Sequence, residues 1–162
     1  MISLAILGAG RWGNHLIRNF LSQDRAEIVA IVDPKPAQLN WIKQQYAFPA
    51  SVQFLTDWRS VLDGQFKLDG IVVVTPALTH GTIVEAALLN QLHVLAEKPL
   101  TLTVAEAQHL TRLAEQQNRQ LVIDHTYLFH GAVQAGQQAV AQLGTLRYGY
   151  ATRTNLGPVR LS

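Results

Sequence analysis

The 162 residues are 48% hydrophobic and 15% charged, which predicts a compact core and leaves too little chain for two ordinary domains. The 13 basic and 11 acidic residues give a net charge of +2, and the basic ones are scattered, which excludes a nucleic-acid-binding surface. The chain has no cysteine, hence no disulfide or thiolate chemistry, and no apolar run reaches the ~18 residues of a membrane span. Because no signal peptide is recognisable either, we expect a cytoplasmic protein.

The chain begins with an apolar run, Ile2 to Leu7, that leads directly into the turn Gly8-Ala9-Gly10-Arg11-Trp12-Gly13. The GxGxxG spacing is typical of a loop that brings a dinucleotide pyrophosphate to the N-terminus of a helix. In that loop Gly8 permits the tight turn, Gly10 lets the backbone approach the phosphates, and Gly13 lets the helix pack against the strand.

A second apolar run, Ile28 to Val32, ends at Asp33, where a carboxylate can accept hydrogen bonds from both hydroxyls of a ribose. The order of these features, a strand, the glycines, a helix, a second strand and an acid, favours a dinucleotide site over a glycine turn of some other α/β protein. Asp33 favours NAD. Lys35 leaves NADP open, because a lysine can bind a 2′-phosphate.

Further short apolar runs predict four more strands, with helical patterns between them. Asp57 is a candidate cap for a short helix through Leu62, Thr79 begins a helix toward Asn90, and Thr103 with Glu106 forms a capping box for a helix to Gln117. The additional strands are expected at 52–55, 70–75, 93–96 and 121–124. Apolar strands alternating with helices predict an α/β fold, a doubly wound parallel-sheet Rossmann domain over residues 1–124.

Polar segments follow three of these strands, at the edge where open α/β sheets bind ligands. The first holds Thr75, Pro76, Thr79 and His80, which either line a pocket or form an ordinary capped turn. In the second, Glu97-Lys98-Pro99, Lys98 can bind a substrate hydroxyl or share in proton transfer, whereas a solvated ion pair is the alternative.

The third polar segment, Asp124 to His130, contains two histidines, an aspartate and a tyrosine that can bind a polar substrate. The spacing of His125 and His130 is a poor metal-ligand pattern, so no metal is expected.

The last part of the chain departs from this pattern. A helix is expected over 129–143 with Gly144 as its stop, followed by an alternating strand over 145–155 that has no partner. Such an unpaired edge predicts a homo-oligomer through this strand, the alternative being a tail that folds back or stays disordered.

Taken together, these residues resemble the glucose-fructose oxidoreductase, inositol dehydrogenase and MocA family of NAD(P)-dependent sugar and cyclitol dehydrogenases, with Glu97-Lys98-Pro99 the most specific match. The resemblance implies hydride transfer from a secondary alcohol carbon to nicotinamide. It also implies a cofactor loop, an acid on the adenine ribose, a segment near the nicotinamide, and a catalytic lysine that assists proton transfer. The corresponding cofactor-binding residues are Gly8, Gly10, Arg11, Trp12, Gly13, Asp33, Thr75, Pro76, His80 and Glu97, and the catalytic lysine is Lys98.

Members of that family are about twice as long, and their second domain carries an Asp-x3-His motif with the catalytic histidine. We therefore expect 125–162 to be a helix and first strand of an incomplete α+β substrate domain, and the chain to be weakly active or inactive alone. Two alternatives stay open, one half of a split dehydrogenase and a non-enzymatic NAD-binding regulatory module.

Overall fold

The computed structural model describes residues 1–145, 147–152 and 154. The chain forms two compact units, Met1–His125 and Thr126–Ser162.

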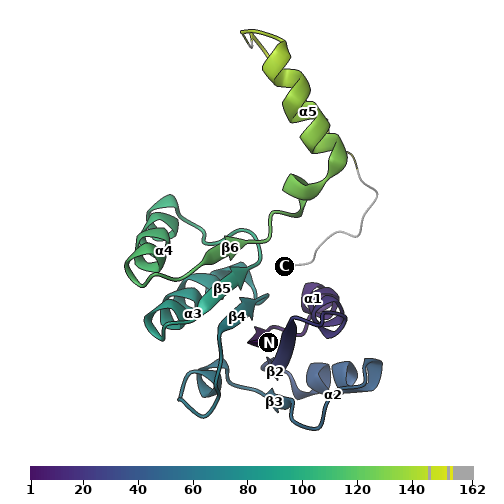
Figure 1. Ribbon diagram of the computed structural model, residues 1–162, viewed down its shortest axis with the longest axis vertical. Helices are drawn as coiled ribbons and strands as arrows, with labels where there is room; N and C mark the ends of the chain where they lie inside the picture. Colours follow the sequence, from purple (N-terminus) through teal and green to yellow (C-terminus); the bar gives the residue numbers. More distant parts are fainter. Residues whose placement is uncertain (146, 153, 155–162) are drawn as a thin grey trace. The chain divides into compact units, whose positions relative to one another are not determined.

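The first unit is built on one six-stranded sheet whose paired strands are all parallel (Figure 1). The strand order is β3-β2-β1-β4-β5-β6, so the chain winds outward from β1 in one direction and, after crossing back to β4, in the other. This order confirms the doubly wound Rossmann fold. The strands are β1 (Ile2–Leu7), β2 (Ala26–Val32), β3 (Gln53–Leu55), β4 (Gly70–Val73), β5 (His93–Ala96) and β6 (Leu121–Ile123).

Helices cover the sheet on both faces, and alternate side chains of each central strand feed two separate cores. Ile6 of β1 packs with one apolar cluster, whereas its neighbours Ala5 and Leu7 belong to the other. The first cluster contains residues of α1 (Arg11–Leu21) and α2 (Pro36–Gln45), and the second contains residues of α3 (Ala77–Leu89) and α4 (Val104–Gln116). Full burial of each large aliphatic side chain contributes about 1.5–3 kcal/mol, which explains why these strands are apolar on both faces.

Two predicted helix caps are confirmed. The Thr103 hydroxyl accepts a hydrogen bond from the Glu106 N–H at the start of α4 (3.2 Å), and the Asp57 carboxylate accepts one from the Arg59 N–H (3.0 Å). Asp57 thereby starts a 3-10 helix, η1 (Trp58–Val61). Helix α3 begins at Ala77 rather than at Thr79, because Pro76 already fixes the backbone as the residue preceding the helix.

The second unit contains a 3-10 helix, η2 (Thr126–Phe129), followed by α5 (Gly131–Gln142). Helix α5 begins two residues later than predicted, because the imidazole of His130 accepts a hydrogen bond from the Ala132 N–H (3.3 Å) and caps it. Gly144 follows the helix with φ of 74°, as expected for a glycine stop.

The strand predicted over 145–155 is wrong for the described residues of that segment. Residues 145, 147–152 and 154 are not in a strand, and 146, 153 and 155 lie outside the described part of the chain. Alternating polarity forms a strand only when the backbone has a neighbour to pair with, and the described residues supply none there. The argument for a homo-oligomer through this segment therefore loses its structural basis.

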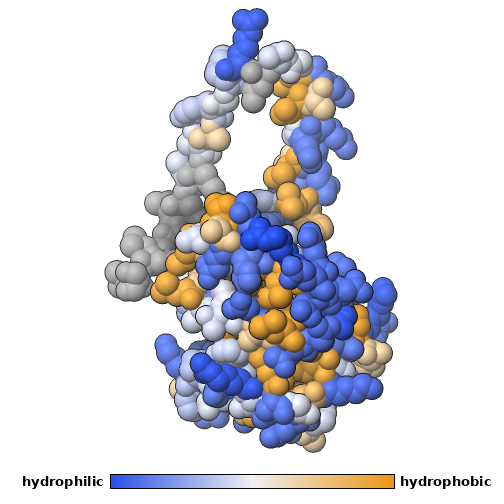
Figure 2. Space-filling model, turned by 90° about the vertical axis from the view of Figure 1, so that its left-hand side faces the viewer, coloured by the Kyte–Doolittle hydropathy of each residue, from blue (hydrophilic) through white to orange (hydrophobic). Residues whose placement is uncertain are grey.

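Apolar side chains are interspersed with polar ones on the face shown in Figure 2. Several exposed apolar side chains belong to α3, α4 and the segment before α4, namely Leu78, Leu89, Leu102 and Val104. Within the described residues, no helix combines the length and the apolar character needed to cross a bilayer.

Candidate functional site

A cleft of about 460 Å³ lies at the carboxyl ends of β1 and β4, where the direction of winding reverses. Open α/β sheets bind ligands at this switch point, because the loops after the two strands diverge and leave a crevice. The last residues of β1 and β2, together with residues that follow β1, β2, β3 and β4, line it: Leu7, Gly8, Gly10, Arg11, Trp12, Val32, Asp33, Pro34, Lys35, Gln38, Thr56, Trp58, Val74, Thr75, Pro76, Thr79 and Ile83.

Two positions of the glycine turn after β1 require glycine. A Cβ at either of them would meet backbone atoms, and Gly8 also has a left-handed backbone conformation. Gly8 has φ of 102°, and a Cβ there would lie 2.6 Å from the Val74 carbonyl oxygen. A Cβ on Gly13 would overlap the carbonyl oxygen of Gly8, so α1 can pack this closely only with glycine at that position. Around Gly10, by contrast, no described atom lies within 4 Å of an added Cβ, and Gly10 therefore keeps space open at the cleft.

Helix α1 starts at this turn without a capping side chain among the described residues, and its first turn has no acidic residue. The first N–H groups of a helix have no partner within the helix, and the helix dipole adds partial positive charge there. The beginning of α1 thus offers hydrogen-bond donors to an anion that reaches the Gly10 side of the cleft.

Asp33 follows β2 and is only 8% exposed. One carboxylate oxygen accepts a hydrogen bond from the Ala9 N–H and the other from the Lys35 N–H, both at 2.9 Å. These bonds fix the acid against the glycine turn. A carboxylate has about four acceptor positions, so others stay available to the hydroxyls of a ribose.

The cleft-lining residues that the sequence did not indicate include Gln38, Thr56 and Trp58. Gln38 donates from its amide to the Ala9 carbonyl oxygen (2.6 Å), while Thr56 and Trp58 follow β3 and supply a polar and an aromatic wall. The rule that led to Thr75, that residues just after a strand meet at one sheet edge, also applies to Thr56 and Trp58. The signal at β3 is weak because this strand has only three residues.

After β4, Thr75 and Pro76 line the cleft as predicted, together with Thr79. The Thr79 hydroxyl lies 2.7 Å from the Pro76 carbonyl oxygen and 2.8 Å from the Thr75 hydroxyl. The segment therefore forms a wall of the cleft, whereas His80 is buried rather than at the surface or in the cleft, and α3 begins without a side-chain cap among the described residues.

His80, Glu97 and Lys98 are not among the residues that line the cleft. His80 is 1% exposed, Glu97 is 7% exposed, and Lys98 is exposed at the end of β5. The Glu97 carboxylate accepts a hydrogen bond from the main-chain N–H of Lys98 (3.0 Å), and the described ion pairs include none between the two side chains. A direct contact between any of these three side chains and a cofactor stays a prediction.

The segment Asp124 to His130 is divided between the two units, and His130 serves as the cap of α5. Within the described residues, no group of three or more histidine, aspartate and glutamate side chains is placed to hold a metal ion.

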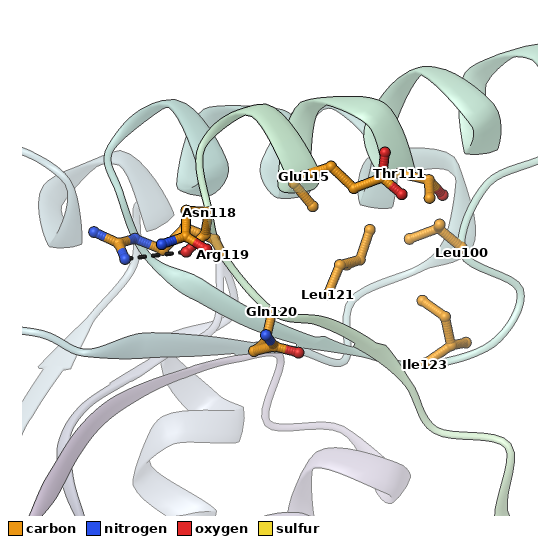
Figure 3. A pocket seen from close by; sticks show the side chains of 9 residues that line it. Leu100, Thr111, Glu115, Asn118, Arg119, Gln120, Leu121 and Ile123 are labelled. Atoms are coloured by element: carbon orange, nitrogen blue, oxygen red, sulfur yellow. Dashed lines mark hydrogen bonds between the residues drawn. The ribbon is translucent and has the colours of Figure 1, made fainter.

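Figure 3 shows a second depression, of about 500 Å³, between α4 and the edge strand β6. Leu100, Leu121 and Ile123 form its apolar side. Arg119 donates to the main-chain carbonyl oxygens of Gln91 (2.7 Å) and Asn118 (3.2 Å). Because the guanidinium of Arg119 is already bonded to the backbone, this depression is a weaker candidate for a ligand-binding site than the cleft.

The glycine turn, the buried acid after β2 and the cleft at the switch point together define a dinucleotide-binding α/β domain. The chain belongs to the glucose-fructose oxidoreductase, inositol dehydrogenase and MocA family, whose profile, described as an oxidoreductase family with an NAD-binding Rossmann fold, matches residues 2–125.

The chain also matches proteins named as dehydrogenases. A UDP-N-acetylglucosamine 3-dehydrogenase of Acidithiobacillus ferrooxidans is 37% identical over 87 residues, which are 54% of this chain and 27% of that protein. A scyllo-inositol 2-dehydrogenase (NAD(+)) of Bacillus subtilis is 29% identical over 108 residues, covering 66% of this chain and 30% of the relative. The chain thus spans less than a third of the length of either relative.

Solved structures agree with this assignment. Biliverdin reductase of Synechocystis, crystallised with biliverdin and NADP+, superposes with a TM-score of 0.78 at 26% identity, covering 89% of this chain and 44% of that one. The scyllo-inositol dehydrogenase of Lactobacillus casei with bound NAD(H) and scyllo-inositol shares the fold with a TM-score of 0.77 at 24% identity, covering 88% and 41%. The domain is therefore of a kind that binds NAD or NADP.

Proposed function

We propose that the cleft binds NAD, and that the chain is the cofactor-binding part of a dehydrogenase acting on a secondary alcohol of a sugar or cyclitol. The observation that carries this proposal is Asp33, buried beside the glycine turn with both oxygens fixed by backbone N–H groups. An acid held there accepts hydrogen bonds from ribose hydroxyls and repels a 2′-phosphate, which supports NAD over NADP.

The other cleft residues suit the remaining parts of a dinucleotide. The uncapped start of α1 and the open side of Gly10 suit the pyrophosphate, and Trp58 offers a flat aromatic surface on which a base can stack. The resemblance to the family assigns Thr75 and Pro76 to the nicotinamide side, and both line the cleft.

A bound nicotinamide supplies the acceptor of the hydride. On this proposal Lys98 donates a hydrogen bond to the substrate hydroxyl and assists the departure of its proton. The main chain of Lys98 is fixed by the Glu97 carboxylate, and its side chain is exposed at the carboxyl edge of the sheet. The substrate class is inferred from relatives named as dehydrogenases of a sugar nucleotide and a cyclitol.

Calorimetric titration of the purified chain with NAD, and separately with NADP, tests the cofactor. We expect NAD to bind more tightly, and Asp33→Ala to weaken NAD about 10- to 100-fold while NADP binding is kept, because hydrogen bonds to a charged group contribute about 1.5–3 kcal/mol. Asp63→Ala is the matched control, since Asp63 also accepts a backbone N–H bond, from Gln65, but does not line the cleft. If neither dinucleotide binds, or if Asp33→Ala binds NAD like the unmodified chain, the proposal is wrong.

A further inference from the structure

The imidazole of His80 links two loops that are far apart in sequence. Its Nδ1 lies 2.8 Å from the Pro99 carbonyl oxygen and its Nε2 lies 2.8 Å from the Thr75 carbonyl oxygen. The ring comes from α3 and is 1% exposed, so water does not compete for these bonds. A carbonyl oxygen only accepts, and a neutral ring donates to one of the two partners whereas a protonated ring donates to both.

The two loops are those that follow the neighbouring strands β4 and β5. These strands are parallel, and Val73 and Ala96, the last residues of the two strands, lie opposite each other, so that the loops with Thr75 and Lys98 leave the sheet side by side. Thr75 lines the cleft, and Lys98 directly precedes Pro99. The His80 ring therefore joins a wall of the cleft to the loop that carries the lysine.

The backbone around Lys98 is held from both sides. Before it, Glu97 donates its N–H to the Val73 carbonyl oxygen (2.8 Å) and accepts the Lys98 N–H with its carboxylate. After it, the Pro99 carbonyl oxygen faces His80. Without His80, the second of these attachments is lost and the Pro99 carbonyl oxygen no longer faces a ring nitrogen, which favours a different loop conformation.

We infer that His80 is a positioning residue, which holds the Glu97–Pro99 loop against the Thr75 turn so that Lys98 stays beside the nicotinamide end of the cleft. This inference rests on the proposed function, and it assigns His80 an indirect role in place of direct contact with the cofactor. On this inference the Lys98 ammonium contacts the cofactor and substrate, and the His80 imidazole does not.

Three variants of His80 distinguish the contribution of the bond to Pro99 from that of the bond to Thr75. In His80→Asn the side-chain amide can replace Nδ1 and donate toward Pro99, in His80→Gln it can replace Nε2 and donate toward Thr75, and His80→Phe keeps a ring without any donor. Only the bond to Pro99 holds the lysine loop directly. We therefore expect His80→Asn to behave like the unmodified chain, and His80→Gln and His80→Phe to release Lys98.

The readout is the rate at which a lysine-acylating reagent modifies Lys98, followed by mass spectrometry with and without saturating NAD. Lys43 and Lys67, which do not line the cleft, are internal controls. In the unmodified chain and in His80→Asn, NAD is expected to slow the acylation of Lys98, and of Lys35 in the cleft, but not that of Lys43 or Lys67. In His80→Gln and His80→Phe this protection is expected to be lost while the NAD affinity, which depends on the glycine turn and Asp33, is retained. If His80 only stabilised the fold, its replacement would lower the NAD affinity and the protection of Lys98 from acylation together.

Retained protection of Lys98 in both His80→Gln and His80→Phe overturns the inference, and so does NAD binding that fails to protect Lys98 in the unmodified chain. If the unmodified chain binds no NAD, the proposed function fails, and amide hydrogen exchange without cofactor then decides the role of His80. Exchange of the Lys98 N–H about tenfold faster in His80→Phe supports the positioning role of His80, because a tenfold change corresponds to about 1.4 kcal/mol, the size expected for the loss of one hydrogen bond. An unchanged rate overturns it.

Discussion

Gly10 and Gly13 are three residues apart in the same turn, yet the structure requires glycine at only one of them. A Cβ on Gly13 meets the backbone of Gly8, whereas a Cβ on Gly10 meets no described atom within 4 Å. The sequence motif has glycine at both positions. Their physical roles differ, because Gly13 serves the packing of α1 and Gly10 serves the space into which a cofactor would fit.

This difference leads to opposite results for two alanine variants. Gly13→Ala is expected to lower the free energy of unfolding by about 1–3 kcal/mol, because backbone atoms must move apart. Gly10→Ala is expected to change it by less than about 1 kcal/mol, since the position precedes a helix. It should nevertheless weaken NAD about tenfold or more, because the methyl group occupies the pyrophosphate space. Urea denaturation and calorimetry measure the two effects, and normal NAD binding by Gly10→Ala would contradict the role assigned to the turn.

Among the elements, helix starts were predicted well where a threonine or an aspartate caps them. Thr103 and Asp57 start α4 and η1 at the positions expected from the sequence. The starts of α3 and α5 were predicted two residues away from their observed positions, because Pro76 and His130 precede these helices as N-cap residues and neither is among the residue types preferred there. The strand expected over 145–155 was wrong for the described residues, since a strand depends on a partner that a local pattern cannot supply.

The cap of α4 gives a prediction at this scale. Thr103→Ala removes the acceptor for the Glu106 N–H and is expected to lower the free energy of unfolding by about 1 kcal/mol, with NAD binding unchanged. Thr82→Ala is the matched control, because Thr82 is an exposed threonine inside α3 and its replacement should change stability by less than about 0.5 kcal/mol. Equal unfolding midpoints for the two variants in urea would show that the cap contributes nothing.

For the molecule as a whole, both apolar cores lie inside the first unit. Their buried members run from Ala5 to Ala114, and the partly buried residues packed against them reach only to Ile123. The cleft is likewise lined by residues of this unit alone. Since folding is driven mainly by apolar burial, the first unit contains what it needs to fold and to bind a cofactor.

A fragment of residues 1–125 is therefore expected to unfold cooperatively, with the urea midpoint of the full chain, and to bind NAD with unchanged affinity. Circular dichroism during denaturation and calorimetry measure these properties. Loss of cooperative unfolding in the fragment would mean that residues beyond 125 stabilise the sheet.

The sequence by itself determined the parallel sheet, the glycine turn after β1 and the acid after β2. Each of these depends on residues within a few positions of one another or on a fixed order of strand, helix and strand. Only the tertiary structure brought Trp58 to the cleft beside Asp33, and only it placed His80 between Thr75 and Pro99. Such contacts depend on which strands become neighbours and how far they extend, and those features follow from the packing of the whole sheet rather than from any local pattern.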